Sequence, residues 1–177
     1  MKLGKLDFVP AEDRPDLLSE PVKAAIQTNK LSGVLVAEID PQLADTAAFC
    51  EKYDIGLDIS ANCVVVEAKR ADKTWYAGCL ILATSRADIN GVIRKQLEAR
   101  KVSFAPTDMA ISLSKMEYGG ITPIGLPDDW TLLVDTAVVD KDYVVIGSGV
   151  RKSKLLIPGK IFASMPNTTI MSITQNT

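Results

Sequence analysis

The segment Asn62–Thr84 reads NCVVVEAKRADKTWYAGCLILAT and sets the architecture of the chain. Its two apolar runs, Asn62–Glu67 and Trp75–Thr84, are rich in β-branched, aromatic and aliphatic residues, and the polar hexapeptide AKRADK separates them. Two such runs on either side of a polar segment predict a β-hairpin with a longer loop. We therefore expect the two runs to form antiparallel neighbouring strands.

Helical and strand patterns follow one another irregularly on both sides of this hairpin. Apolar spacing predicts helices over 17–28, 43–53, 88–100 and 107–115, and strands over 33–40, 132–139, 143–146 and 169–173. Ser85 and Asp88 resemble a capping box for the third helix, although Asn90-Gly91 is a competing turn signal. The mixture of helices and strands places the chain in the α/β class. Because the elements do not alternate strictly as βαβ, we expect a mixed, mostly antiparallel curled sheet or partial barrel with flanking helices.

Length and composition favour a single domain. The chain has 177 residues, of which 47% are hydrophobic and 24% charged, so we expect one domain over 1–177 with 1–30 as an N-terminal extension. The net charge of −2 means that any contact with nucleic acid must be local. No apolar run approaches the ~20 residues that cross a bilayer, and no signal-peptide pattern is present. The expected location is cytoplasmic, without membrane contact.

The residue types that are missing restrict the chemistry. The chain contains no histidine, which excludes Ser/His/Asp and Cys/His nucleophilic systems, a histidine general base and any metal site that needs imidazole. Its three cysteines, Cys50, Cys63 and Cys79, are odd in number and form no CxxC pair. They are interpreted as small buried residues rather than disulfide partners or zinc ligands. Neither a metal nor a cofactor is expected.

A first glycine-rich segment follows the helix predicted over 107–115. The sequence EYGGITPIGLP, residues 117–127, holds three glycines and two prolines. Gly119 and Gly120 can adopt positive φ and allow a ligand or another backbone to approach closely, and exposed amides there could bind a carbonyl group. A helix C-terminal stop followed by a tight turn explains the same residues equally well.

A second glycine-rich segment, VVIGSGVRKSK, covers residues 144–154. Glycines at a strand end beside Arg151, Lys152 and Lys154 could cradle an anion, but a hairpin-like turn with solvated charges is the simpler interpretation. The predicted helix 88–100 also carries Arg94 and Lys95 away from its apolar stripe. That charged face is an ordinary solvated surface unless it lies beside the glycine segments, where it would suit RNA phosphates.

Four segments taken in order, SANCVVV, LILATSRADINGVIRKQL, GGITPIG and VVIGSG, resemble the YbaK/prolyl-tRNA-synthetase-associated family over roughly residues 44–165. The resemblance is most specific in the GxxxP loop, residues 119–123. It implies a mixed curled sheet with surrounding helices and hydrolysis of the ester between a wrong amino acid and its tRNA. The implied partners are the tRNA acceptor end carrying a non-cognate amino acid and an aminoacyl-tRNA synthetase.

The resemblance also implies roles for individual residues. The substrate-binding residues would be Ile121, Thr122 and Pro123 of the GxxxP loop, with Gly147, Ser148 and Gly149 facing them across a cleft. The tRNA contacts would be Arg94, Lys95, Arg151 and Lys152. Family members usually carry a lysine on the strand that enters the pocket, whereas this chain has Ser60-Ala61-Asn62-Cys63 there. The candidate catalytic groups are therefore the side chain of Asn62 and the backbone amides of Gly119 and Gly120.

A chain without histidine is compatible with this reaction, because an aminoacyl ester is already reactive and needs positioning more than a strong nucleophile. Amides of the GxxxP loop would stabilise the oxyanion, by ~3 kcal/mol per donor. The proton would pass to the neighbouring ribose hydroxyl. A binding module that kept the pocket but lost catalysis is the alternative, and Asn62 in place of lysine favours it. We expect Gly120→Val to abolish ligand binding and leave the fold intact.

Overall fold

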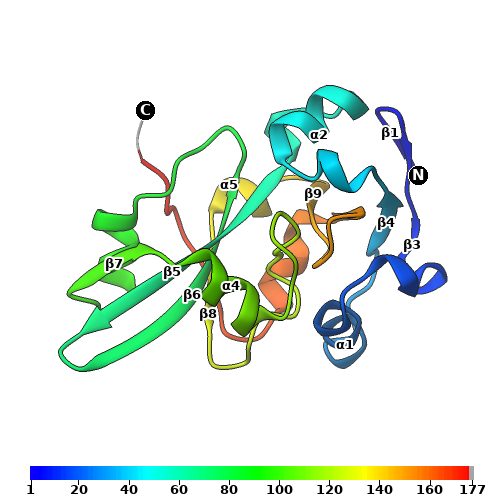
Figure 1. Cartoon of the computed structure of the whole chain (residues 1–177). Coiled ribbons are helices and arrows are strands. Elements are labelled where there is room, and N and C mark those ends of the chain that lie inside the picture. The colour runs from blue at the N-terminus through cyan, green and yellow to red at the C-terminus, as the bar shows by residue number, and fades with distance from the viewer. Residues whose placement is uncertain (176–177) are drawn as a thin grey trace.

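The computed structural model describes residues 1–175 and contains two main sheets, with helices on their outer faces (Figure 1). The strands are β1 Lys2–Leu3, β2 Leu6–Asp7, β3 Val9–Pro10, β4 Leu35–Glu38, β5 Ala61–Arg70, β6 Lys73–Leu82, β7 Lys101–Phe104, β8 Thr131–Val134, β9 Val144–Gly147, β10 Ser153–Ile157 and β11 Thr168–Ile170. The α-helices are α1 Glu20–Thr28, α2 Thr46–Tyr53, α3 Arg94–Gln96, α4 Thr107–Ser114 and α5 Thr136–Val139.

The larger sheet is built around the predicted hairpin, in the order β11-β8-β6-β5-β7. β5 and β6 pair in antiparallel fashion from Ala61 opposite Leu82 to Arg70 opposite Lys73. The prediction of a longer loop was wrong, because the flanking polar residues continue the strands and only Ala71 and Asp72 form the turn. β7 pairs antiparallel with β5, whereas β8 and β11 add parallel strands. The mixed, mostly antiparallel α/β fold is confirmed.

The smaller sheet has the order β3-β4-β10-β9, and all of its strand pairs are antiparallel. β10 was not predicted from the sequence. It pairs with β9 so that Lys154 lies opposite Gly147, which makes the second glycine segment a hairpin connection. The turn interpretation of that segment is therefore confirmed.

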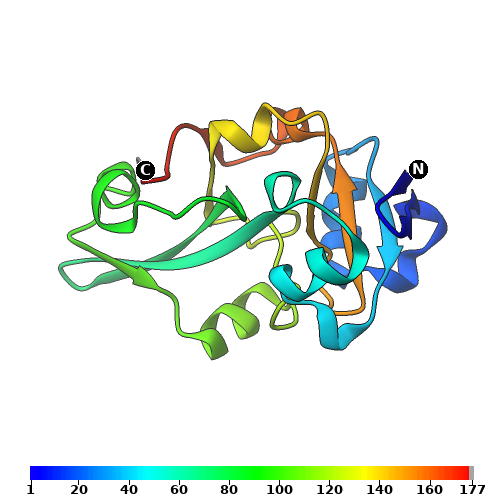
Figure 2. The same ribbon diagram turned by 90° about the horizontal axis from the view of Figure 1, so that it is seen from above.

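The two sheets adjoin without closing into a barrel. Their backbones meet at a parallel bridge between Ser60, just before β5, and Val145 of β9. From there the β5–β6 hairpin extends away from the smaller sheet, as Figure 2 shows. The start of β5 therefore lies beside β9, whereas the hairpin turn lies at the far end of the molecule.

The helix predicted over 88–100 is shorter and less regular than expected. A π-helical turn over Ile89–Ile93 leads into α3, and the segment then continues into the unpredicted edge strand β7. The Asp88 carboxylate, rather than Ser85, caps it by accepting hydrogen bonds from the amides of Gly91 and Val92, both at 3.0 Å. The competing turn signal at Asn90-Gly91 thus marked a real irregularity.

Two other boundaries differ from prediction for local reasons. The first helix begins at Glu20 rather than residue 17, because Pro15–Leu17 form a separate 3₁₀ turn. The strand predicted over 132–139 divides into β8 and α5 at Asp135. The carboxylate of Asp135 accepts from the amide of Ala137 at 3.0 Å, which caps α5, and from the amide of Ile173 at 2.9 Å.

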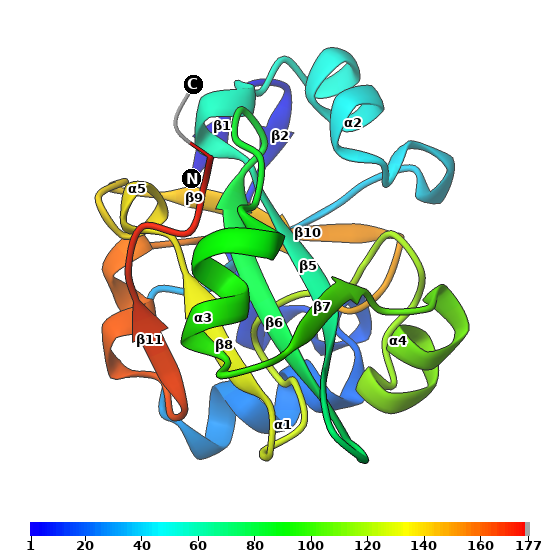
Figure 3. The same ribbon diagram turned by 90° about the vertical axis from the view of Figure 1, so that its left-hand side faces the viewer.

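The core has one part on each side of the larger sheet and a third beneath α2. Ile93 and Leu97 cover one sheet face, and Figure 3 shows α3 in front of those strands. On the other side, Val22 of α1 packs with Ile124 and Ile146. Residues 1–30 therefore contribute to the main core. Within residues 1–175, no helix is long and apolar enough to span a membrane.

Candidate functional site

The two glycine-rich segments contact each other directly through their backbones. The amide of Gly149 donates to the carbonyl of Gly120 at 2.8 Å, and the amide of Glu117 donates to the carbonyl of Gly149 at 2.9 Å. Gly147 lies so close that an added Cβ would be 2.5 Å from the Gly120 carbonyl oxygen. We call Gly119, Gly120, Gly147 and Gly149 the glycine junction. In the part of the chain that the structure describes, its two segments touch, so no open cleft separates them.

This contact explains why glycine occupies these positions. A Cβ on Gly120 would lie 2.7 Å from the carbonyl oxygen of Val150, and a Cβ on Gly149 would meet Ser19. Backbone atoms cannot move aside as a flexible side chain can. The expectation that Gly120→Val leaves the fold intact is therefore wrong.

Arg151 covers the exposed side of the junction at Gly119. Its Nη1 donates to the carbonyl of Tyr118 at 2.9 Å, and its Nε donates to the carbonyl of Pro41 at 3.1 Å. Gly119 has a φ of +80°, and an added Cβ would lie 2.5 Å from Arg151 Nη1. The missing side chain therefore makes room for a guanidinium group at the surface.

Asn62 lies next to the junction. Ser60 bridges Val145 in the parallel sense, and Asn62 and Gly147 each follow this bridge by two residues along their strands. Its Oδ1 accepts a hydrogen bond from Thr46 Oγ1 at 2.6 Å, and the side chain is half-buried. Among residues 1–175 its Nδ2 has no partner, so this amide group is free to donate.

Lys154, which the sequence placed only among the cations beside the second glycine segment, is buried. It lies opposite Gly147 in the sheet, and only 6% of the residue is exposed. Its Nζ donates to the carbonyl of Ala44 at 2.8 Å and lies 5.3 Å from the centre of the Phe49 ring. Burial is the main cause that lowers the pKa of Lys154 from 10.5 to about 8, and the charge of Arg151 acts in the same direction.

Segment Pro41–Thr46 connects these groups. It supplies the carbonyl of Pro41 to Arg151, the carbonyl of Ala44 to Lys154 and the hydroxyl of Thr46 to Asn62. The burial of Lys154 was not predicted, because no local pattern brings it close to the Pro41–Thr46 segment. The available signal was one lysine within the otherwise apolar run that follows Ser153.

The backbone donors of the GxxxP loop differ in availability. The amide of Gly120 already donates to the carbonyl of Glu117 at 2.9 Å, whereas the amide of Gly119 has no partner within the described residues. Ser148 is fully buried, and its hydroxyl donates to the carbonyls of Val150 and Ser153, both at 3.1 Å. Thr122 is also fully buried, and its Oγ1 has no hydrogen-bond partner among residues 1–175.

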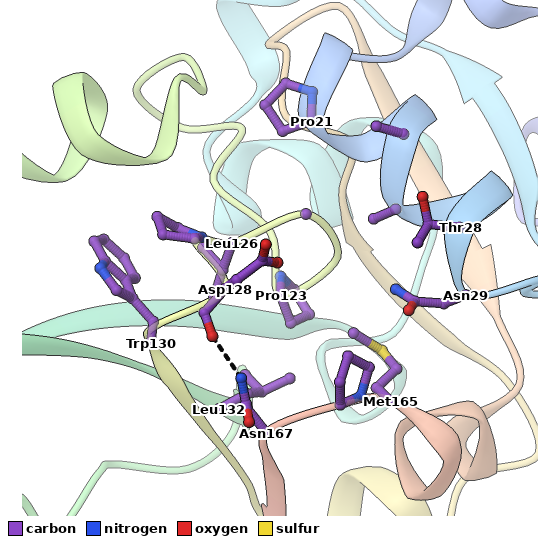
Figure 4. A pocket seen from close by; sticks show the side chains of 15 residues that line it. Pro21, Thr28, Asn29, Pro123, Leu126, Asp128, Trp130, Leu132, Met165 and Asn167 are labelled. Carbon is purple, nitrogen blue, oxygen red and sulfur yellow. Dashed lines mark hydrogen bonds between the residues drawn. The ribbon is translucent and has the colours of Figure 1, made fainter.

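The far end of the GxxxP loop borders a cavity of about 330 Å³ between α1, residues 123–128 and residues 165–167 (Figure 4). Pro123, Leu126 and Met165 supply apolar walls, with Thr28, Asn29 and Asn167 as polar members. Nδ2 of Asn167 donates to the carbonyl of Asp128 and ties the two rims together. Trp130, stacked on Tyr76 with 5.6 Å between ring centroids, lines the same cavity. Only one side of the loop therefore adjoins this cavity.

The four predicted tRNA-contacting residues fall into two places. Arg151 and Lys152 lie at the glycine junction, whereas Arg94 and Lys95 lie on α3 near the tip of the β5–β6 hairpin. Cys50 and Cys79 are buried as expected, and Cys63 is half-buried against Gly78. Burial raises the pKa of Cys79 to about 12, so this thiol is not a nucleophile at neutral pH.

The fold is that of a YbaK-like α/β domain. The family model for the aminoacyl-tRNA editing domain matches residues 40–163, which include Asn62, the glycine junction and Lys154. The chain belongs to the aminoacyl-tRNA editing domain family.

Solved structures show the same fold at low sequence identity. The hypothetical protein APE2540 is 16% identical, with a TM-score of 0.76 over 88% of this chain and 100% of its own. A protein described as a candidate trans-editing enzyme for prolyl-tRNA synthetase is 13% identical, with a TM-score of 0.75 over 90% of this chain and 99% of its own. No curated protein matches this chain by sequence.

Proposed function

We propose that this chain is a cytoplasmic trans-editing hydrolase that cleaves the ester bond of mischarged aminoacyl-tRNA, with the whole chain acting as one domain. One observation carries the proposal: Asn62, Gly119 and the pair Arg151 and Lys154 come from three segments distant in sequence and gather around the glycine junction. All four present hydrogen-bond donors or positive charge. Ester hydrolysis develops negative charge on the carbonyl oxygen, and donors of this kind stabilise it.

In this proposal the oxyanion donors are the free amide of Gly119, Nδ2 of Asn62 and the guanidinium of Arg151. Each donor would lower the free-energy barrier of hydrolysis by ~3 kcal/mol or less. Lys154 acts from beneath as a buried positive charge, which is felt more strongly than a surface charge because water does not screen it. It is a positioning residue, since it is buried and its Nζ faces the carbonyl of Ala44 rather than the exposed side of the junction. Gly120 acts by packing, because its amide is bonded to Glu117.

Specificity comes from the cavity beside Pro123. Its apolar walls and volume of about 330 Å³ can hold an amino-acid side chain, and Pro123 is the lining residue that belongs to the GxxxP loop, with Ile121 and Thr122 directly before it in the chain. A second selection of this kind is needed because a synthetase separates side chains that differ by one methylene by only ~1–3 kcal/mol. Arg151 and Lys152 would contact the acceptor end of the tRNA. The similar protein described for prolyl-tRNA synthetase makes mischarged tRNA(Pro) the first substrate to test.

The test is to incubate the purified protein with a panel of mischarged and correctly charged tRNAs and to follow loss of the ester. We expect hydrolysis of one mischarged species and a fall of about tenfold or more for Asn62→Ala. Exposed Lys2→Gln is the matched control and keeps full activity. Deacylation of no member of the panel by the folded protein would refute the proposal.

The protonation step has its own test. A charged tRNA ending in 2′-deoxyadenosine lacks the neighbouring hydroxyl that would take a proton from the attacking water while giving its own to the departing ester oxygen. We expect a much slower reaction on this substrate, whereas an unchanged rate would remove the ribose from the mechanism.

A non-catalytic binding module is the second candidate. The direct contact across the junction and the occupied amide of Gly120 favour it, because both leave fewer groups for the reaction. The same tRNA panel separates the two functions. A binding module would protect the aminoacylated end of the tRNA from nuclease and leave its ester bond intact.

A further inference from the structure

Positive charge is concentrated in one part of the chain. Residues 69–101 contain eight lysines and arginines and three acidic residues, whereas the rest of the chain contains 12 basic and 19 acidic residues. One of the three carboxylates, that of Asp88, is occupied in capping the helix. A chain with a net charge of −2 therefore has one strongly basic region.

These cations line a groove at the tip of the β5–β6 hairpin. Arg70, Arg94, Lys95 and Arg100 border a hollow of about 580 Å³, with Glu98 as the one carboxylate. A second hollow of about 290 Å³ shares Arg70 and Glu98 and adds Lys73, Trp75 and Asp72. We call the two hollows together the hairpin-tip groove.

Local structure fixes the arginines without neutralising them. Nη1 of Arg70 donates to the carbonyl of Glu98 at 3.3 Å, and Nε of Arg94 donates to the carbonyl of Asn90 at 2.9 Å. The amide of Arg100 is held by the carbonyl of Lys69 at 2.9 Å.

Carbonyl oxygens orient these groups but leave their positive charge in place. Within residues 1–175, the four cations of the larger hollow form no ion pair. Lys69 beside them does, with Glu67 at 2.7 Å. The groove therefore presents unpaired charge to the solvent.

We propose that the hairpin-tip groove binds the phosphodiester backbone of an RNA stem. Guanidinium groups match phosphate oxygens in pairs, and neutralising phosphates with released counterions supplies most of the affinity of such contacts. Three arginines and two lysines around one groove fit a row of phosphates better than a single anion. The groove also lies well away from the site at Asn62, so it acts as a docking surface and not as part of the cleavage machinery.

The dimensions of the hairpin separate docking from cleavage. β5 spans ten residues between the start of the strand and the groove, a length of about 30 Å. An RNA stem held at the tip could thus place its 3′ end at the glycine junction (Figure 1). The proposal rests on the proposed editing function only for the choice of a tRNA acceptor stem as the RNA.

The binding test uses an uncharged, fluorescently labelled acceptor-stem minihelix, with anisotropy measured over a range of KCl concentrations. At 0.1 M salt each lost phosphate contact costs roughly eightfold in affinity, so Arg70→Gln combined with Arg100→Gln lowers affinity roughly 60-fold. The slope of log affinity against log salt falls by about 2. Both arginines are exposed. The control variant Lys2→Gln with Lys160→Gln removes two exposed charges elsewhere and keeps the wild-type affinity.

A second measurement separates this proposal from the editing function. Hydrolysis of a short aminoacyl-CCA oligonucleotide, which cannot reach the groove, is unchanged in the Arg70/Arg100 variant, whereas hydrolysis of the aminoacyl minihelix falls with its affinity. If RNA binding depends on the groove but neither the aminoacyl-CCA oligonucleotide nor the aminoacyl minihelix is hydrolysed, the groove proposal is supported and the editing function is refuted. Equal loss of binding in the two variants, or binding to anionic lipid vesicles in place of RNA, would overturn the groove proposal.

Discussion

Lys154→Met is expected to stabilise the protein at neutral pH and to lose that advantage in alkaline solution. Folding buries Lys154 and lowers its pKa from 10.5 to about 8, a difference worth about 3 kcal/mol. Below pH 8 both the folded and unfolded states carry the proton, so the folded state bears this whole cost. Between about pH 8 and 10.5 only the unfolded state keeps its proton, and stability rises with pH.

The substitution removes the buried charge and also the hydrogen bond to Ala44, which contributes about 1 kcal/mol. The net gain in unfolding free energy is therefore about 2 kcal/mol at pH 6 to 7, and it disappears or reverses by about pH 10.5. Urea unfolding followed by tryptophan fluorescence at several pH values measures the difference between variant and wild type.

Lys152→Met serves as the control for this measurement, because the neighbouring Lys152 is exposed. The difference in unfolding free energy between Lys152→Met and the wild type should not change with pH. Parallel pH curves for Lys154→Met and the wild type would show that Lys154 does not release its proton early, and would refute the reasoning.

Four further predictions follow from single contacts. Asp135→Asn replaces one carboxylate oxygen with an NH₂ group that faces the backbone amide of Ala137 or Ile173. It should lower the free energy of unfolding by about 2 kcal/mol, which thermal unfolding would show as a lower Tm. Trp130→Ala removes a buried ring from the cavity wall and should cost about 3–5 kcal/mol in urea unfolding. Gly147→Ala forces a Cβ against the Gly120 carbonyl and should lower both stability and ester hydrolysis, whereas Ala61→Gly should not slow hydrolysis. If the charge of Lys154 assists the reaction, kcat should fall as the pH rises past about 8, and Lys154→Met should remove that step from the profile.

Several elements could be predicted from sequence because their signals are local. The apolar runs on either side of AKRADK determined the central antiparallel pair, and the spacing of Met109 and Leu113 determined α4. The GxxxP loop was recognisable from its glycines and proline, and it led to the family. These patterns depend only on residues a few positions apart, whose geometry the backbone fixes.

Errors arose where local signals compete. β7 and α5 are short, and each follows directly on another element, so periodicity over an 11-residue window could not separate them. The two-residue turn at Ala71 was missed because its polar neighbours look like a loop, although they pair with one another at the solvent-exposed end of the hairpin. Whether a polar residue ends a strand or continues it depends on what its partner strand does.

The sequence alone determined that the chain has glycine segments, a hairpin and no histidine. Only the tertiary structure decided that the glycine segments touch, that Arg151 fills the space beside Gly119, and that Lys154 is buried with its Nζ on the carbonyl of Ala44. The physical reason is that such contacts join residues far apart in the chain. Their proximity follows from how the sheets pack as a whole, which no short stretch of residues encodes.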